Sequence, residues 1–310
     1  MRRKIVKQGA STLTISLPSA WTHRFNLSGD QEIDIEDRGS ELIIRTTNPV
    51  TGPSTSFDAH ALGRLVNRSV INAYHLGFDA IEVSKISDLN NPESTRILDE
   101  LLGFEITDQS ASTIVMKDVT GTAPKEFSNL LRRLFLQIKT LIEDGSSALA
   151  KHDLKTLQQL AAKDKEINKL THTCLRQISK NGFAPNTQRS YSMYLTIHRL
   201  EEISDQFKVL YSAAAKTSSL SPDFGTLCNE VSSLFSSCYN FIYQMTPEKA
   251  LEISSAYDDL KTRLAEHGKQ NPAEIYLSHS LAIISHHILG IQGSHLGFLG
   301  TTTNDKVSNI

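Results

Sequence analysis

The chain has 310 residues, with 32 lysines and arginines against 34 aspartates and glutamates, so its formal net charge is -2. This length predicts about two domains or a little more, and a hydrophobic content of 39% is enough for packed cores, which excludes a disordered chain. No apolar run reaches the roughly 18 residues that a membrane-spanning helix needs, and the charged start lacks the apolar stretch of a signal peptide. We therefore expect a cytoplasmic protein without membrane insertion.

The first predicted elements are a strand and a short helix. Residues 12–17 alternate hydroxyl and apolar side chains, the period of two that indicates a strand with one packed face and one wet face. Residues 9–11 predict a turn back to the preceding strand. Pro18 ends the second strand and begins an amphipathic helix with Trp21 and Phe25, because proline is tolerated in a helix's first turn.

The charge of this segment is one-sided. Residues 1–25 contain five lysines and arginines and no acid, whereas the acids begin at Asp30. A basic face beside small hydroxyl groups suits contacts with DNA phosphates and base edges, and from charge alone a solvated strand with ordinary lysines is an equal alternative. The residues predicted to contact DNA are Arg2, Arg3, Lys4, Lys7, Gln8, Ser11, Thr12, Thr14 and Arg24.

Two more strands and a linker follow. Residues 32–37 and 41–46 form a predicted hairpin around a turn at residues 38–40. Residues 48–56, NPVTGPSTS, have the composition of a linker between two independent bodies.

The pattern of the first 47 residues is a recognisable one. It consists of Lys7-Gln8-Gly9, Leu13-Thr14-Ile15-Ser16-Leu17-Pro18, Trp21, Leu27, Gly29-Asp30, Ile33, Ile35 and Leu42-Ile43-Ile44. It resembles the swapped-hairpin domain of the AbrB/SpoVT/MazE family, in which two copies interleave into one small β-barrel that binds DNA. The resemblance implies a homodimer, and a segment this short cannot bury an adequate core alone. Ala10 departs from the family, where an asparagine is common.

Residues 57–119 predict a small α/β module. Helices are expected at residues 62–73 and 92–102, and strands at 80–83, 104–107 and 113–119. The segment has no phosphate-binding loop and no catalytic constellation. We therefore favour a structural or dimerising role over a small-molecule sensor.

From residue 124 the pattern is helical. Helices are predicted at residues 124–152, 154–178, 187–216, 223–244, 247–267 and 272–293, many of them begun by proline or an acid. This repeat predicts two antiparallel three-helix bundles, at residues 124–217 and 222–294. The fold class is therefore multidomain α+β: a dimeric swapped-hairpin β-barrel, a small α/β module and tandem all-α bundles. The tail, residues 301–310, is expected to fray.

Two kinds of metal-binding or reactive side chain occur in the helices. Glu201 and Asp205 lie one turn apart, and with Asp164 from the preceding helix they could form an oxygen site for a hard or borderline divalent cation. Ordinary ion pairs with Arg199 and Lys208 are the alternative. The three cysteines, 174, 228 and 238, lack CxxC spacing and fall at apolar helical positions, which predicts buried reduced thiols.

The duplicated three-helix pattern carries a second resemblance. Asp164-Lys165-Glu166-Ile167-Asn168-Lys169-Leu170 and Leu200-Glu201-Glu202-Ile203-Ser204-Asp205 are similar to the phosphate uptake regulator PhoU, whose E/DxxxD motifs are associated with metal clusters. This implies a divalent or iron-type metal ion in the first bundle. The second repeat departs from the motif, because Ala282 and His286 stand where carboxylates are expected.

A swapped-hairpin head joined to a PhoU-like body resembles archaeal PhoU-type regulators. The resemblance implies a dimeric transcription regulator of phosphate uptake or a related nutrient response that binds double-stranded DNA. The alternative is an adaptor that contacts a phosphate transporter or its sensor without binding DNA. The sequence shows no nucleophile with a base and no nucleotide loop, so we do not expect an enzyme.

Overall fold

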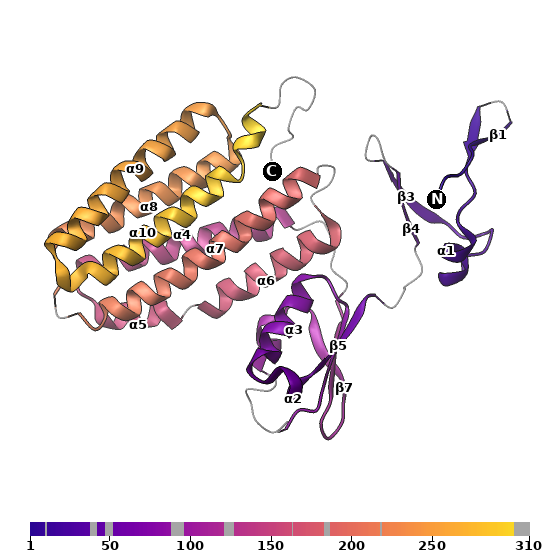
Figure 1. Cartoon of the computed structure of the whole chain (residues 1–310), viewed down its shortest axis with the longest axis horizontal. Coiled ribbons are helices and arrows are strands. Elements are labelled where there is room, and N and C mark those ends of the chain that lie inside the picture. The colour runs from indigo at the N-terminus through magenta and orange to yellow at the C-terminus, as the bar shows by residue number, and fades with distance from the viewer. Residues whose placement is uncertain are drawn as a thin grey trace. The chain divides into compact units, whose positions relative to one another are not determined.

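The computed structural model of the chain describes residues 1–9, 11–37, 42–46, 52–87, 96–120, 127–162, 164–182, 187–217 and 219–300 (Figure 1). The chain divides into two compact units, Met1–Pro53 and Ser54–Ile310. The first contains short strands and one short helix, and the second contains a small sheet followed by long helices. The predicted mixed α+β class, with a largely helical C-terminal half, is confirmed.

The first unit contains two β-hairpins. Strand β1 (Val6–Gln8) pairs antiparallel with β2 (Thr12–Thr14), and β3 (Ile33–Asp37) pairs antiparallel with β4 (Leu42–Thr46). Helix α1 (Ser19–Arg24) follows the extended Pro18, as predicted. Strand β2 is shorter than the predicted strand 12–17, and the predicted turn at residues 38–40 lies outside the described residues.

No described side chain of the first unit is buried. Several large apolar side chains are mostly exposed, among them Leu13 at 66%, Ile35 at 60% and Leu42 at 62%. The described strands form two separate two-stranded sheets and no closed barrel. The described part of this unit therefore has no core of its own. An isolated hairpin is only marginally stable in water, so these hairpins need a further contact to be stable.

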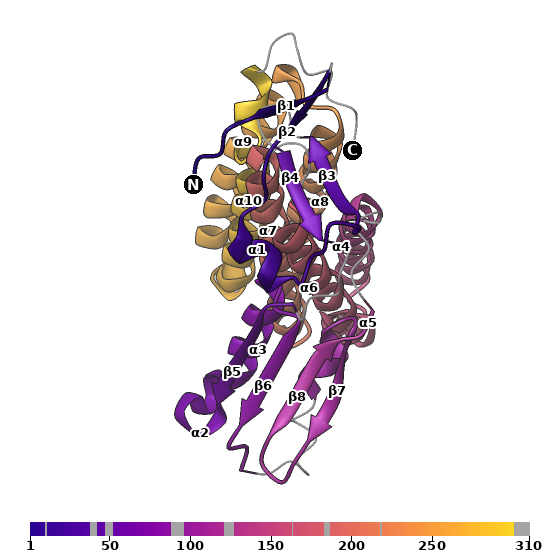
Figure 2. The ribbon, with the colours of Figure 1, turned by 90° about the vertical axis from the view of Figure 1, so that its right-hand side faces the viewer.

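The second unit begins with an α/β module built on a four-stranded sheet. The strands are β5 (Ser54–Asp58), β6 (Ala80–Ser84), β7 (Phe104–Gln109) and β8 (Ile114–Asp118). They lie in the order β5-β6-β8-β7, with β5 and β6 parallel and the other neighbours antiparallel (Figure 2). The predicted linker is wrong at its end, because residues 54–56 belong to β5.

Helical segments connect these strands. They are α2 (Ala59–Leu62), the 3-10 turn η1 (Gly63–Leu65), α3 (Val66–His75) and the 3-10 helix η3 (Arg96–Glu100). The Asp58 carboxylate caps α2 by accepting from the Ala61 N–H at 3.0 Å. Gly77 follows α3 with a φ of 86°, as expected for a helix end. The predicted helix 92–102 is only partly described, and its described part is the 3-10 helix η3.

Long helices make up the rest of the unit. They are α4 (Phe127–Ala150), α5 (Leu154–Ala162), α6 (Asp164–Asn181), α7 (Thr187–Ala214), α8 (Pro222–Tyr243), α9 (Pro247–Gln270), the 3-10 turn η5 (Pro272–Glu274), α10 (Ile275–Gly293) and the 3-10 helix η6 (Leu296–Gly300). The predicted helix 154–178 corresponds to α5 and α6, on either side of residue 163, which is not described. None of the described helices is long and apolar enough to cross a membrane.

All these long helices share one hydrophobic core. Helices α7 and α10, which belong to different predicted repeats, pack along each other (Figure 1). Fully buried side chains from both triplets, such as Phe135 of α4 and Phe235 of α8, contact each other with ring centroids 6.0 Å apart. The two predicted triplets therefore form one continuous core, and their division into separate domains stays a prediction.

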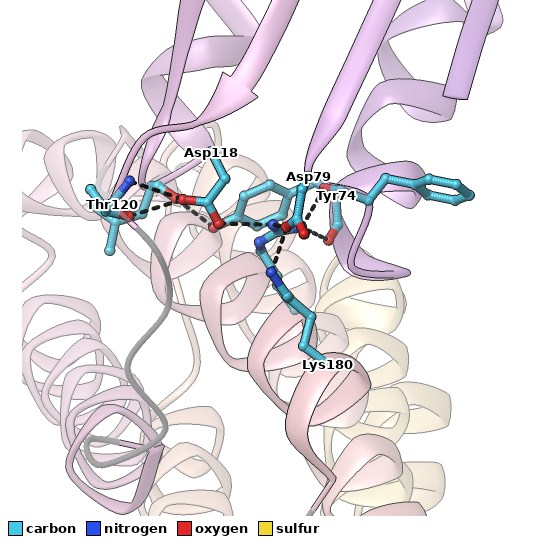
Figure 3. A network of polar contacts seen from close by, with 8 residues as sticks. Tyr74, Asp79, Asp118, Thr120 and Lys180 are labelled. Atoms are coloured by element: carbon cyan, nitrogen blue, oxygen red, sulfur yellow. Dashed lines mark hydrogen bonds and ion pairs between the residues drawn. The ribbon is translucent and has the colours of Figure 1, made fainter. Parts of the chain in front are cut away.

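Arg176 of α6 joins the α/β module to the helices. Its side chain is fully buried, and its guanidinium donates to the backbone oxygens of Tyr74 and Phe78 at 3.1 and 2.7 Å. It also donates to Asp79 and Asp118 at 2.5 and 2.9 Å, and Figure 3 shows these two acids within one network of polar contacts.

The surroundings of Arg176 favour the charged form of Asp118. The guanidinium carbon lies 4.9 Å from the ring centres of Tyr74 and Phe104, a cation–π geometry. Burial of Asp118 favours its neutral form, yet the Arg176 guanidinium and Thr120 hold the pKa of Asp118 below its ordinary value. Buried charges are tolerated only when paired in this way, so the junction requires Arg176.

Gly77 allows the module and α6 to approach closely. A Cβ atom at this position would lie 2.7 Å from Cγ of Lys180. Lys180 pairs with Asp79 beside Arg176 (Figure 3). The glycine at the end of α3 therefore serves both the left-handed backbone and the contact with α6.

We expect the substitution Arg176→Met to lower the free energy of unfolding by about 3–5 kcal/mol, because it removes the positive charge that pairs with the buried Asp118 carboxylate. Urea denaturation followed by circular dichroism would measure this. The control is Lys139→Met, which removes an exposed pair with Glu143 and should cost about 0.5 kcal/mol or less. Equal losses in the two variants would show that Arg176 does not anchor the module.

Candidate functional site

The first hairpin arranges part of the predicted DNA-contacting set on two faces. In the β1–β2 pair, Gln8 lies opposite Thr12 and Lys7 lies opposite Leu13. Because opposite residues share a face and successive residues alternate, Gln8, Thr12 and Thr14 share one face. Within this hairpin, Lys7 therefore lies on the face opposite to that of Gln8, Thr12 and Thr14.

The remaining predicted residues surround the hairpin. Arg2, Arg3 and Lys4 precede β1, and Arg24 ends α1; all four side chains are exposed. Ser11 lies in the turn. The Thr14 hydroxyl donates to the Val6 backbone oxygen at 3.2 Å, so within the hairpin it is already used as a donor. The cations are thus free to reach phosphates, and the hydroxyl of Thr14 is better placed to accept than to donate.

The predicted metal residues lie on two helices. Glu201 is half-buried on α7, and Asp205, one turn later, is exposed. Asp164 is the first residue of α6, and its side chain lies outside the described part of the structure. Among the described residues, no group of three histidines, cysteines or acids is arranged to hold a metal ion. A metal site at Asp164, Glu201 and Asp205 therefore stays a prediction.

Histidines surround Glu201 instead. Nδ1 of His198 lies 3.5 Å from Glu201 Oε2, and His75 and His172 are near enough to act on its charge. Burial opposes ionisation of Glu201, but the hydrogen bond with His198 and the charges of His172 and His75 produce a net lowering of its pKa. Glu201 is therefore ionised at neutral pH in a histidine-rich setting.

Two of these histidines connect the module to the helices. His75, at the end of α3, and His172, on α6, are both buried, with Nε2 of His75 at 2.9 Å from Nδ1 of His172. Nε2 of His172 also lies 3.6 Å from the Glu100 carboxylate of η3. The sequence could not have indicated this pair, because 97 positions separate the two residues and neither belongs to a spaced motif.

Further along α7, Arg199 and Glu202 contact α10. Arg199 donates to Glu202 at 2.9 Å and lies 2.8 Å from Nδ1 of His287, which is 3.2 Å from Glu202. The expected ion pairing of Arg199 with the neighbouring acids is therefore confirmed for Glu202. This cluster links the two predicted repeats, and it is structural rather than a metal-ligand set.

The cysteines are inert in this fold. Cys174, Cys228 and Cys238 are buried and free, as predicted. Burial raises the pKa of Cys174 to about 12 and raises that of the other two as well. Since the thiolate is the reactive form, these thiols are core side chains.

Comparison with protein families matches residues 131–210 to the PhoU domain. This segment runs from α4 through α5 and α6 into α7, the first predicted repeat. A PhoU-like helical region is therefore confirmed there, and it points to regulation of phosphate homeostasis. Neither the curated proteins nor the solved structures contain a match to the chain. The swapped-hairpin resemblance of residues 1–47 stays a prediction.

The His75–His172 contact should make the second unit sensitive to acid. Burial, and then the charge of His172, lower the pKa of His75 from 6.5 to about 4. Between these two values the unfolded chain binds a proton that the folded chain does not, so stability falls as the pH drops from about 6.5 towards 4. The limiting slope is about 1.4 kcal/mol per pH unit.

Urea denaturation of the wild type and of His75→Gln across this pH range would measure the slope. The variant should lose less stability than the wild type between pH 6.5 and 4. The control is His279→Gln, which changes an exposed histidine of α10. If His75→Gln and the control keep the same pH dependence as the wild type, His75 does not titrate as argued.

Proposed function

We propose that this protein is a dimeric, DNA-binding transcription regulator of phosphate uptake or a related nutrient response. The observation that carries the proposal is the joining of two features in one chain. A PhoU-matching helical region lies in the second unit, and an exposed, acid-free basic segment begins the first. The match supports the regulatory role, and the charge supports the choice of DNA as partner.

The exposed apolar faces of the first unit support dimerisation. In the β3–β4 pair, Ile33, Ile35, Ile44 and Leu42 share one face by register. Ile35 and Leu42 are mostly exposed, and burying apolar area contributes about 25 cal/mol per Å². A second copy of the same unit offers an identical apolar face and unpaired strand edges. We therefore propose an interleaved barrel of two copies, which would supply the missing core.

The proposed barrel holds DNA mainly through charge. Arg2, Arg3, Lys4 and Arg24 would neutralise phosphates, an interaction that positions the protein without reading sequence. Gln8 and Thr12, which share a face, are the proposed base-contacting pair, and glutamine pairs well with adenine in the major groove. Lys7, on the opposite face, would contact a phosphate at the edge of the interface.

The helical body would act as the sensor. We assign to it a response to a metal ion at Asp164, Glu201 and Asp205, to a phosphate-linked signal, or to a partner protein. A signal can alter DNA binding only if it binds two states of the body with different affinity. The buried Arg176 junction supports such coupling as far as the module, because two ion pairs connect the module to α6.

The alternative is an adaptor that regulates a phosphate transporter or its sensor through protein contacts. The family match is compatible with this adaptor, because the matched residues lie in the helical body and not in the basic first unit. In that case the first unit would serve only to dimerise.

DNA binding is tested by fluorescence anisotropy with labelled promoter-region fragments at several salt concentrations. Counterion release predicts that the logarithm of the DNA affinity falls linearly with the logarithm of the salt concentration. Each phosphate contacted contributes about 0.9 to the magnitude of that slope. The double substitution Arg3→Ala and Lys7→Ala should therefore weaken binding to all fragments and reduce the slope by about two.

The matched control is Lys139→Ala with Lys261→Ala, which removes two positive charges from helices of the second unit. It should leave DNA affinity unchanged within about twofold. Binding that is absent in the wild type, or weakened equally by both double variants, would contradict the regulator and favour the adaptor.

Dimerisation through the first unit is tested by the substitution Ile35→Asp. Placing a carboxylate in the proposed interface should weaken dimerisation at least about tenfold, because a buried unpaired charge is costly. Light scattering after size-exclusion chromatography at several protein concentrations would measure it. The control, Leu251→Asp, changes a side chain of α9 that is 70% exposed, and the dimer should persist. A monomeric wild type, or a dimer unaffected by Ile35→Asp, would contradict this arrangement.

A further inference from the structure

A polar cavity of about 350 Å³ lies between the start of α4 and the end of α8. Helix α4 contributes Ser128, Asn129 and Arg132, and the end of α8 contributes Tyr239, Asn240, Tyr243 and the adjoining Gln244. The two helices pack along each other in the shared core (Figure 1). None of the residues that line it belongs to those predicted to contact DNA or to bind a metal ion.

The described residues that line this cavity include a positive charge and no negative charge. Every described residue lining this cavity is polar, one is a cation, and none is a carboxylate. A second cavity, between α4 and α6, contains Glu166 and the apolar Leu136 and Ile167, and a third, inside the module, is lined almost entirely by apolar side chains. Among the described cavities, this lining alone combines a cation with many neutral donors and no competing acid.

Several of its donors are unused within the described residues. Arg132 is exposed and makes no ion pair or hydrogen bond with any of them, and the buried Tyr243 hydroxyl has no hydrogen-bond partner there. The Gln244 side-chain oxygen accepts from Lys249 Nζ at 2.6 Å, so its NH₂ group remains available. Lys249 also brings a second positive charge to the cavity's edge.

The aromatic side of the cavity is firmly supported. The Tyr239 ring meets the buried Phe135 edge-on at 5.4 Å and lies 4.9 Å from the Tyr243 ring, centre to centre. Burial, and then the neighbouring Tyr239, raise the pKa of Tyr243 to about 12, so its hydroxyl remains a donor at neutral pH. The helix dipoles do not decide the preference, because the positive start of α4 and the negative end of α8 oppose each other. The side chains therefore determine it.

We propose that this cavity binds a small molecule carrying a phosphate or carboxylate group, with Arg132 as its anion-binding residue. Arginine presents a planar fork that matches both groups, and amide and hydroxyl donors complete the set. The volume lies at the lower end for small-molecule pockets, which suits a metabolite with a planar ring beside Tyr239. This inference gives the helical body an effector site and does not rest on DNA binding or on a metal.

Isothermal titration calorimetry of the full chain is the test, with adenosine monophosphate, inorganic phosphate, succinate and adenosine as probes. Adenosine monophosphate should bind more tightly than inorganic phosphate, and adenosine, which lacks the anion, should not bind. Binding of succinate but of neither phosphate compound would assign the site to carboxylates, and the reverse would assign it to phosphates.

Two variants and a matched control locate the ligand. Arg132→Ala should weaken binding of the tightest probe about tenfold or more, and Tyr243→Phe should weaken it about threefold. The control is Arg133→Ala, which removes the same charge from the next position of α4 but lines the other cavity; it should change affinity less than twofold. Circular dichroism melting curves confirm that the three variants fold.

Three results would overturn the proposal. They are no binding of any anionic probe by the wild type, equal loss in Arg132→Ala and Arg133→Ala, or binding of adenosine as tight as that of adenosine monophosphate. None of them depends on whether the chain binds DNA, so failure here is distinguishable from failure of the proposed regulator.

Discussion

The burial of one guanidinium group constrains most of the second unit. Arg176 has no exposed side-chain surface, and its two terminal nitrogens donate to two backbone oxygens and two carboxylates of the module, with two aromatic rings of the module beside the guanidinium. Its Nε has no hydrogen-bond partner among the described residues. Leaving such a charge unpaired in the interior would cost several kcal/mol. The α/β module and α6 therefore form a single body, and the PhoU-matching region cannot be understood without the sheet attached to it.

The two units obtain their stability in different ways. The second unit has one core along its helices and another beneath the sheet of the module. The first has no buried side chain in its described part and exposes apolar residues on both hairpins. In the proposed dimer, association would supply the core that this unit lacks, and its folded population would then depend on protein concentration.

Sequence patterns predicted the long helices well and the junctions poorly. The apolar stripe of α4 and the proline that begins α9 are local signals, and both helices appear where expected. Strand β5 was missed because STSFD contains a single large apolar residue, and its parallel pairing with β6 is a tertiary contact. Lys7 and Gln8 lie on opposite faces of β1 because successive side chains of a strand alternate. This could be inferred only once the strand was known to begin at Val6.

The candidate sites also differ in whether a local sequence signal announces them. The basic segment could be noticed because Arg2, Arg3, Lys4 and Lys7 lie close together in the sequence, with no acid before Asp30. His75 and His172 near Glu201, and the α8 residues that face Arg132, come from elements far apart in the chain. No spacing rule connects them, because only the packing of α3 on α6, and of α4 on α8, brings them together.

Gly77 gives a way to read related sequences. Its left-handed backbone and the approach of Lys180 leave no room for a Cβ atom as long as the module lies on α6. In a homologous chain with the same junction, glycine at this position should therefore occur together with the buried arginine and its aspartates. A chain that had lost the module would be free to vary at all these positions at once. Their joint presence or absence would thus record, in sequence alone, whether a PhoU-like body carries this attached sheet.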